Sequence, residues 1–203
     1  MTRRLWLCRH GETAGQSSIR YHGSNDVPLS DLGRAQIAAL APILRGLHPV
    51  RIVSSPLSRA RESAAILTAA CAFATPVDVD ERLREVSFGH CEGLTAEEIG
   101  ARYPEFWERH RAGTVDAFPG GESRTAFRER VAAAARELAA GGDDQDVLVV
   151  AHRGTVRSAL LALLGGVVDG PRFSVQLGSV SVARRTATWE LELLDFVPDD
   201  APR

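Results

Sequence analysis

The chain has 203 residues, of which 44% are hydrophobic, so it is long and apolar enough to form one globular domain with a substantial core. A formal net charge of −2 excludes the global basic field on which nucleic-acid binders rely, and any attraction for anions must be local. No apolar run is long enough to span a membrane, and the three cysteines show neither a disulfide framework nor metal-ligand spacing, which favours a cytoplasmic protein.

Short apolar runs alternate with stretches of helical periodicity along the chain. In chain order, this pattern predicts a strand at 5–8, a helix at 31–47, a strand at 51–54, a helix at 57–71, a strand at 77–79, one or two short helices at 95–110, a long helix after residue 123, a strand at 147–151, a helix at 155–164 and a strand pair at 180–185 and 188–194. Ser30 and Ser123 are placed as helix N-caps, and Pro42 should kink its helix.

This alternation predicts an α/β fold in which residues 1–203 form a single domain. The expected architecture is a three-layer sandwich with a mostly parallel central sheet and helices on both faces. No internal repeat, low-complexity segment or linker interrupts the chain.

Two of the predicted strands lead directly into a histidine. The first strand runs into Arg9-His10-Gly11, and the strand at 147–151 runs into His152-Arg153-Gly154. Ligands of open α/β sheets gather beyond the carboxyl ends of the strands, and glycine there leaves backbone N–H groups free for an anion. A lone histidine at such a place is more often structural, but two histidines at the same edge indicate a functional site.

Two further charged residues can reach the same edge of the sheet. Arg59 lies just inside the helix that follows the strand at 51–54, where it can bind a phosphoryl group together with Arg9, because guanidinium matches phosphate oxygens bidentately. Glu85 lies in a polar connection that can fold over this edge and protonate a leaving oxygen, provided that burial raises its pKa. Arg61, by contrast, is expected to point into solvent.

Five segments together resemble a known family. They are Arg9-His10-Gly11-Glu12-Thr13, Pro28-Leu29-Ser30-x-x-Gly33-x-x-Gln36, Ser54-Ser55-Pro56-Leu57-x-Arg59-Ala60, Leu83-x-Glu85-x-x-Phe88-Gly89-x-x-Glu92-Gly93 and His152-x-Gly154-x-x-Arg157. In this order they resemble the histidine phosphatase superfamily, also called phosphoglycerate mutase-like. The first segment alone would arise often by chance, but the five together are highly specific. Residues 21–30 look most like the α-ribazole phosphatase branch of that family.

The resemblance implies a role for each residue of the expected site. His10 would be the phosphorylated nucleophile and Glu85 the proton donor, while Arg9, Arg59 and His152 would hold the transferred phosphoryl group. The nucleophile must attack as neutral imidazole, and its other ring nitrogen needs an acceptor that fixes the tautomer. Neither a metal nor another cofactor is expected. The candidates for further substrate contacts are Gly11, Thr13, Gln16, Gly23, Arg153 and Gly154.

Two of these positions depart from the family pattern. Gln16 stands where many members carry an asparagine that contacts phosphate, so this contact is either kept by the longer amide or lost. Arg153 stands where a small residue is common. Its side chain either points into solvent or adds a positive charge at the mouth of the pocket, which would favour substrates with a second anionic group.

The spacing of the motifs favours a phosphatase over a mutase. A mutase must keep water from the phosphohistidine, which demands a lid. The interval from Glu85 to His152 is shorter than the insertion expected for a mutase, and the tail after Phe196 is short. The expected activity is therefore that of a metal-independent phosphomonoesterase for a small phosphorylated metabolite, with α-ribazole phosphate or a sugar phosphate as candidate substrates.

Three alternatives stay open at this stage. The first is a phosphotransferase of the cofactor-dependent phosphoglycerate mutase type, and the second is a non-catalytic module that binds phosphorylated ligands. The third is a metallohydrolase built from His10, His22, His90 and His152, whose spacing shows no ligand pattern. The expected partner is the metabolite, with no nucleic acid and no membrane. The sequence leaves the oligomeric state open, a homo-oligomer included.

Overall fold

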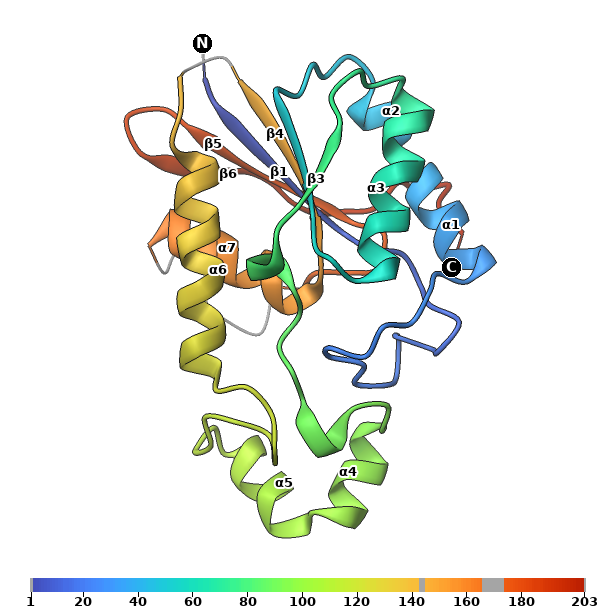
Figure 1. Ribbon diagram of the computed structural model, residues 1–203, viewed down its shortest axis with the longest axis vertical. Helices are drawn as coiled ribbons and strands as arrows, with labels where there is room; N and C mark the ends of the chain where they lie inside the picture. The colour runs from blue at the N-terminus through green and yellow to red at the C-terminus, as the bar shows by residue number, and fades with distance from the viewer. Residues whose placement is uncertain (1, 143–144, 166–173, 203) are drawn as a thin grey trace.

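A six-stranded sheet with the order β3-β2-β4-β1-β5-β6 forms the centre of the computed structural model, which describes residues 2–142, 145–165 and 174–202 (Figure 1). β1 (Arg4–Arg9) lies between β4 (Asp146–Ala151), to which it is parallel, and β5 (Val180–Arg185), to which it is antiparallel. β2 (Arg51–Ser54) pairs in parallel with both β4 and β3 (Val77–Val79). β6 (Trp189–Phe196) pairs antiparallel with β5. The sheet is therefore mostly parallel, as predicted.

Helices cover both faces of this sheet. Alternate residues along the central strands point to opposite faces, so each strand contributes to two separate cores. One core contains Leu5, Leu7, Val147 and Val149 and is covered by α6 (Arg124–Ala139) and α7 (Arg153–Leu164). The other contains Trp6, Cys8, Leu148 and Val150 and is covered by α1 (Asp31–Ala38), α2 (Ala41–Leu44) and α3 (Ser58–Cys71).

A smaller helical unit lies away from the sheet, at the bottom of Figure 1. It consists of α4 (Ala96–Arg102) and α5 (Pro104–Arg111), preceded by the short 3-10 turns η1 (Glu81–Leu83) and η2 (Gly89–Cys91). A third cluster of apolar side chains, rich in aromatic rings, holds this unit together, with Phe118 at its buried centre. Tyr21 packs edge-on against Phe88 in this cluster, which joins the loop after β1 to the helical unit.

The predicted elements differ from the structure mainly at helix ends. The expected helix at 31–47 is two helices, because α1 ends at Ala38 and Pro42 lies in the first turn of α2, where proline is tolerated, rather than inside a kinked helix. The stretch at 95–110 likewise divides before Pro104. α7 begins two residues earlier than the predicted Thr155. Among the described residues, no helix has the length and apolar character needed to cross a membrane.

Candidate active site

His10 and His152 lie next to each other at the carboxyl edge of the sheet. The last residues of β1 and β4, Arg9 and Ala151, are paired in register, so the residue that follows each strand is delivered to the same place. The two imidazole ring centroids are 5.1 Å apart with an interplanar angle of 62°. Both side chains are almost completely buried, with 4% of His10 and 1% of His152 exposed. The sheet register therefore brings together the two histidines that the sequence singled out.

The hydrogen bond of His10 decides which ring nitrogen is free. Its Nδ1 lies 2.7 Å from the carbonyl oxygen of Gly11, and because a carbonyl can only accept, Nδ1 carries the proton. Nε2 then keeps its lone pair. Burial, followed by the charges of Arg59 and Arg9, lowers the pKa of His10 well below its ordinary value. The imidazole is therefore neutral at neutral pH, which a nucleophile requires.

Arg59 connects α3 to the loop after β1 and to the second histidine. Only 2% of this side chain is exposed, and its two terminal nitrogens donate to the carbonyls of Gly23 and Asn25, each at 2.7 Å. Its Nε donates to Nδ1 of His152 at 3.3 Å. Nδ1 of His152 is thus an acceptor, which leaves Nε2–H to donate to Ser55 Oγ at 2.7 Å. Burial and the charge of Arg59 lower the pKa of His152 well below its ordinary value.

Arg9 keeps part of its hydrogen-bonding capacity unused. One terminal nitrogen donates to the carbonyl of Val175 at 2.7 Å, whereas Nε is buried and has no partner among the described residues. Burial lowers the pKa of Arg9 to about 10, partly offset by the charge of Glu85, so the guanidinium is still charged at neutral pH. A buried charged donor without a partner is costly unless an anion completes it. Arg9 is therefore suited to bind an anionic group.

The carboxyl group of Glu85 lies against the N-terminus of α7. Only 8% of this residue is exposed. Its Oε2 accepts from the backbone N–H of Gly154 at 2.9 Å, and its Oε1 accepts from that of Val86 at 3.0 Å. A Cβ atom at position 154 would lie 2.5 Å from Oε1, so only glycine leaves room for the carboxyl group here. These contacts fix the plane of the carboxyl group at the edge that carries both histidines.

A cavity of about 630 Å³ opens at this edge. Its walls contain six of the predicted residues, namely Arg9, His10, Gly23, Arg59, Glu85 and Arg153. The rest of the wall is formed by residues 17–22, Phe88 and residues 95–97 at the start of α4, none of which was predicted to contact substrate. The capping box of Thr95 and Glu98 marks the start of a helix, but no signal in the sequence places that helix beside the cavity.

The remaining candidates lie outside the cavity lining. Gly11 packs against the backbone of Gly33, where a Cβ atom would lie 2.2 Å from the carbonyl oxygen. Thr13 is buried and its hydroxyl lies 2.7 Å from that of Ser17. Gln16 is exposed, with a positive φ of 63°. Gly154 donates its backbone N–H to Glu85, and the ring of His152 is hydrogen-bonded to Arg59 and Ser55. That either residue contacts the substrate stays a prediction.

The chain between Glu85 and His152 contributes more to the cavity than its length suggested. This interval was expected to be too short for a lid, yet α4 and the aromatic cluster form one wall of the cavity.

No group of three or more His, Cys, Asp or Glu side chains within residues 2–142, 145–165 and 174–202 could hold a metal ion. The four histidines of the metallohydrolase alternative therefore do not gather into one cluster in this part of the chain.

Comparisons with known proteins show the family of the chain and its fold. The sequence model of the histidine phosphatase superfamily (branch 1) matches residues 5–195. A glucosyl-3-phosphoglycerate phosphatase from Mycolicibacterium vanbaalenii is 38% identical over 174 residues, which are 82% of this chain and 76% of that protein. The solved structure of a mycobacterial glucosyl-3-phosphoglycerate phosphatase has a TM-score of 0.81 at 31% identity and covers 96% of this chain and 99% of its own. The α-ribazole phosphatase from Shigella flexneri has a TM-score of 0.80 at 25% identity, with 95% and 96% covered.

Proposed function

Because the chain belongs to the histidine phosphatase superfamily, we propose that it hydrolyses phosphomonoesters through a phosphohistidine on His10, without a metal ion. The observation that carries this proposal is the 2.7 Å contact between Nδ1 of His10 and the carbonyl oxygen of Gly11. It fixes the tautomer in which Nε2 of a buried, neutral imidazole has a free lone pair. The relatives named above are phosphatases of small phosphorylated metabolites, and this chain is a phosphatase of that kind.

In the first step, Nε2 of His10 attacks phosphorus in line with the bond to the leaving oxygen. A nitrogen–phosphorus bond forms as the phosphorus–oxygen bond breaks, and negative charge is spread over the three equatorial oxygens. Arg9 and Arg59 both line the cavity, and the charges of their guanidinium groups stabilise the transition state where water is excluded. The unused Nε of Arg9 is one donor that the phosphoryl group would satisfy.

Glu85 completes both half-reactions. As the carboxylic acid it gives its proton to the leaving oxygen, which departs as an alcohol and leaves Glu85 as the carboxylate. The carboxylate then accepts a proton from the water that attacks the phosphohistidine. The nitrogen–phosphorus bond breaks, inorganic phosphate leaves, and His10 and the protonated Glu85 are restored. The backbone N–H of Gly154 keeps the carboxyl group oriented throughout.

The cavity is far larger than a phosphate group, so we propose that it also binds the leaving group of the metabolite. Arg153 lines this cavity and is exposed. Its guanidinium forms no hydrogen bond or ion pair with the described residues, so it is available to bind a substrate. Its charge suits a substrate that carries a second anionic group beside the phosphate. Glucosyl-3-phosphoglycerate, named for two relatives, has such a carboxylate, and α-ribazole phosphate does not.

A screen of phosphorylated metabolites tests this proposal. It includes glucosyl-3-phosphoglycerate, α-ribazole phosphate, 3-phosphoglycerate and several sugar phosphates, and it measures both phosphate release and phosphate transfer to a second molecule. Release to water is expected for every substrate that reacts. Transfer of the phosphate back to phosphoglycerate would instead assign the mutase-type activity, and the absence of any reaction, even with an aryl phosphate, would leave a binding module.

A further inference from the structure

Arg130 of α6 uses its whole guanidinium to hold the segment that carries Glu85. Its two N–H groups on Nη1 donate to the carbonyls of Arg82 and Arg84, each at 2.7 Å. One N–H on Nη2 donates to the carbonyl of Glu85 itself at 3.2 Å. The remaining two donors, on Nε and Nη2, bind the two carboxylate oxygens of Glu122, each at 2.7 Å. All five N–H donors of the side chain are thus satisfied.

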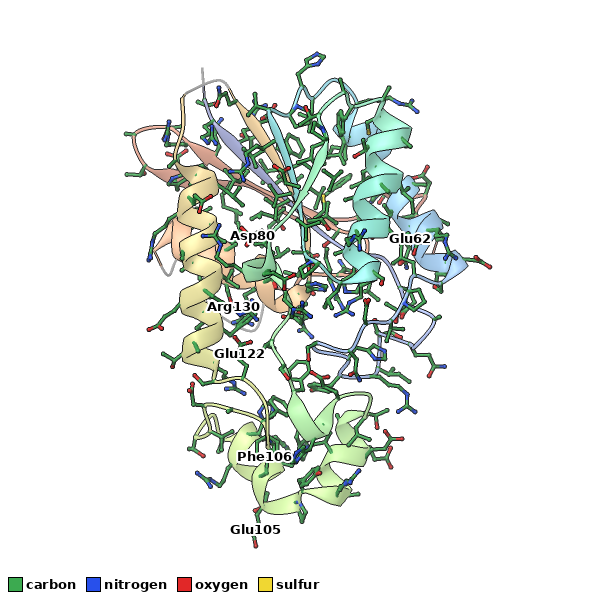
Figure 2. The ribbon with its side chains drawn as sticks, in the orientation of Figure 1. Glu62, Asp80, Glu105, Phe106, Glu122 and Arg130 are labelled. Atoms are coloured by element: carbon green, nitrogen blue, oxygen red, sulfur yellow. The ribbon has the colours of Figure 1, made fainter. Side chains whose placement is uncertain are left out.

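The guanidinium is itself held in place from two sides. Glu122 binds it bidentately, and the carbon of the guanidinium lies 4.8 Å from the centroid of the Phe127 ring, which is buried. Figure 2 shows Arg130 and Glu122 together between α6 and the segment that follows β3. A planar fork fixed in this way can position several acceptors at once, which a point charge cannot.

Besides Arg130, the hydroxyl of Thr155 holds the start of the segment around Glu85, because it donates to the carbonyls of Leu83 and Arg84 at 3.3 and 3.4 Å. Residues 85–87 lie between η1 and η2 and form no regular secondary structure, so no helix or strand hydrogen bonds fix their backbone. Glu122 also holds the far end of this segment, because its backbone N–H donates to the carbonyl of Ser87 at 3.0 Å. Neither Arg130 nor Glu122 lines the cavity. Their contacts therefore concern the backbone around Glu85 and not the substrate.

We propose that Arg130 and Glu122 are positioning residues that hold the carboxyl group of Glu85 in the place from which it protonates the leaving oxygen. Hydrogen bonds to the side chain of Glu85 orient the carboxyl group, and Arg130 fixes the backbone from which that side chain extends. A displacement of about 1 Å at a reacting group can cost about a hundredfold in rate, so a loose backbone here would impair proton donation. This inference rests on the acid role of Glu85 in the proposed function.

The test compares kcat/KM of the full chain across phosphomonoesters whose leaving groups range from p-nitrophenol to a simple alcohol. This parameter reports the steps up to departure of the leaving group, in which an acid matters most when the leaving group is poor. Arg130→Gln should lower kcat/KM about tenfold or more for the alkyl phosphate and less than about threefold for p-nitrophenyl phosphate. Arg130→Lys should not restore the alkyl activity, because one ammonium cannot replace the fork.

Arg82 offers a matched control, because it also ties the segment after β3 to α6. Its guanidinium binds Asp80 at 2.7 Å and Glu137 of α6 at 2.8 Å, through side chains alone. Arg82→Gln should therefore keep the wild-type dependence on the leaving group. Glu122→Gln keeps the guanidinium of Arg130 and its contacts with the backbone. It should show the same selective loss as Arg130→Gln to a smaller degree, and it replaces Arg130→Gln in the test if that variant does not fold.

The outcomes separate this inference from the function on which it rests. A loss of equal size on all leaving groups, or no loss, in Arg130→Gln and Glu122→Gln would overturn the positioning role if Glu85→Gln shows the selective loss. If Glu85→Gln itself lowers kcat/KM equally for all leaving groups, the acid role fails and the positioning role falls with it. A selective loss in Glu85→Gln, Arg130→Gln and Glu122→Gln, and not in Arg82→Gln, supports both.

Discussion

Nε of Arg59 donates a hydrogen bond to Nδ1 of His152 at 3.3 Å, which joins the start of α3 to the end of β4 across the site. The bond requires His152 to be neutral at Nδ1, because a protonated nitrogen cannot accept. Since Arg59 also donates to the carbonyls of Gly23 and Asn25, one buried guanidinium orients the second histidine and shapes the loop that lines the cavity.

Arg59→Lys should lower kcat/KM for an aryl phosphate by about a hundredfold, because an ammonium cannot bind two carbonyls, a histidine and a phosphoryl group together. The free energy of unfolding should fall as well, since two buried carbonyls lose a donor. Steady-state kinetics and urea unfolding measure both effects. Arg61→Lys, on the exposed side of the same helix, is the control and should change neither. Wild-type kinetics in Arg59→Lys would show that Arg59 does not bind the phosphoryl group.

The free energy of unfolding should depend on pH through His10 and His152. Both have their pKa lowered in the folded chain, chiefly by burial, so the unfolded chain binds protons that the folded chain does not. Their contribution is complete above pH about 6.5 and is lost as pH falls below it, by up to about 1.4 kcal/mol per pH unit for each group. Urea unfolding between pH 7.5 and 5 measures this slope.

The same measurement on variants assigns the slope to particular groups. His10→Asn and His152→Asn should each make the free energy of unfolding less dependent on pH below 6.5, because one proton-linked group is removed. A wild-type slope in both site variants would contradict the assignment of neutral, buried histidines.

Arg153→Ala should raise KM about tenfold for a substrate with a second anionic group, because an opposite charge at the mouth of the cavity is lost. KM for p-nitrophenyl phosphate, which has no such group, should stay within about twofold of the wild-type value. Arg153→Lys keeps the charge and should retain most of the difference between the two substrates. Equal KM changes on both substrates would place Arg153 in solvent or on the phosphoryl group instead.

Activity should be undiminished after prolonged treatment with a strong chelator, because the charges of Arg9 and Arg59 take the place that a metal would have in stabilising the phosphoryl group. Phosphate release from an aryl phosphate is measured before and after dialysis against the chelator, and again with Zn²⁺, Mg²⁺ or Mn²⁺ added back. Loss of activity that an added metal restores would revive the metallohydrolase alternative.

The strand-end residues of the site were predictable because strand periodicity and parallel pairing together dictate where they lie. A run such as residues 147–151 reads as a buried strand, and its next residue, His152, has to emerge at the carboxyl edge. The wall formed by Phe88 and the start of α4 was not predictable. Its position depends on the packing of Tyr21, Phe88 and Phe118 into a cluster, and sequence spacing carries no trace of that contact.

The hydrogen bonds from Arg130 to the segment around Glu85 could not be predicted from the sequence, for a related reason. In the sequence, Arg130 is one of several charged residues on the long helix after residue 123, and it donates to backbone carbonyls more than forty positions away. Backbone acceptors are present at every residue, so no pattern marks the ones that will be used. The break between α1 and α2 shows the same limit, because proline predicts an interruption but not whether it kinks a helix or starts a new one.

The phosphohistidine on His10 can be trapped and located directly. Glu85→Gln is mixed with radiolabelled p-nitrophenyl phosphate, because loss of the base should slow hydrolysis of the intermediate, and the reaction is quenched in alkali. We expect one label per chain that is stable to base and labile to acid. It should lie on the peptide containing His10 and be absent in the double variant with His10→Asn. A label on another residue, or wild-type turnover by His10→Asn alone, would contradict it.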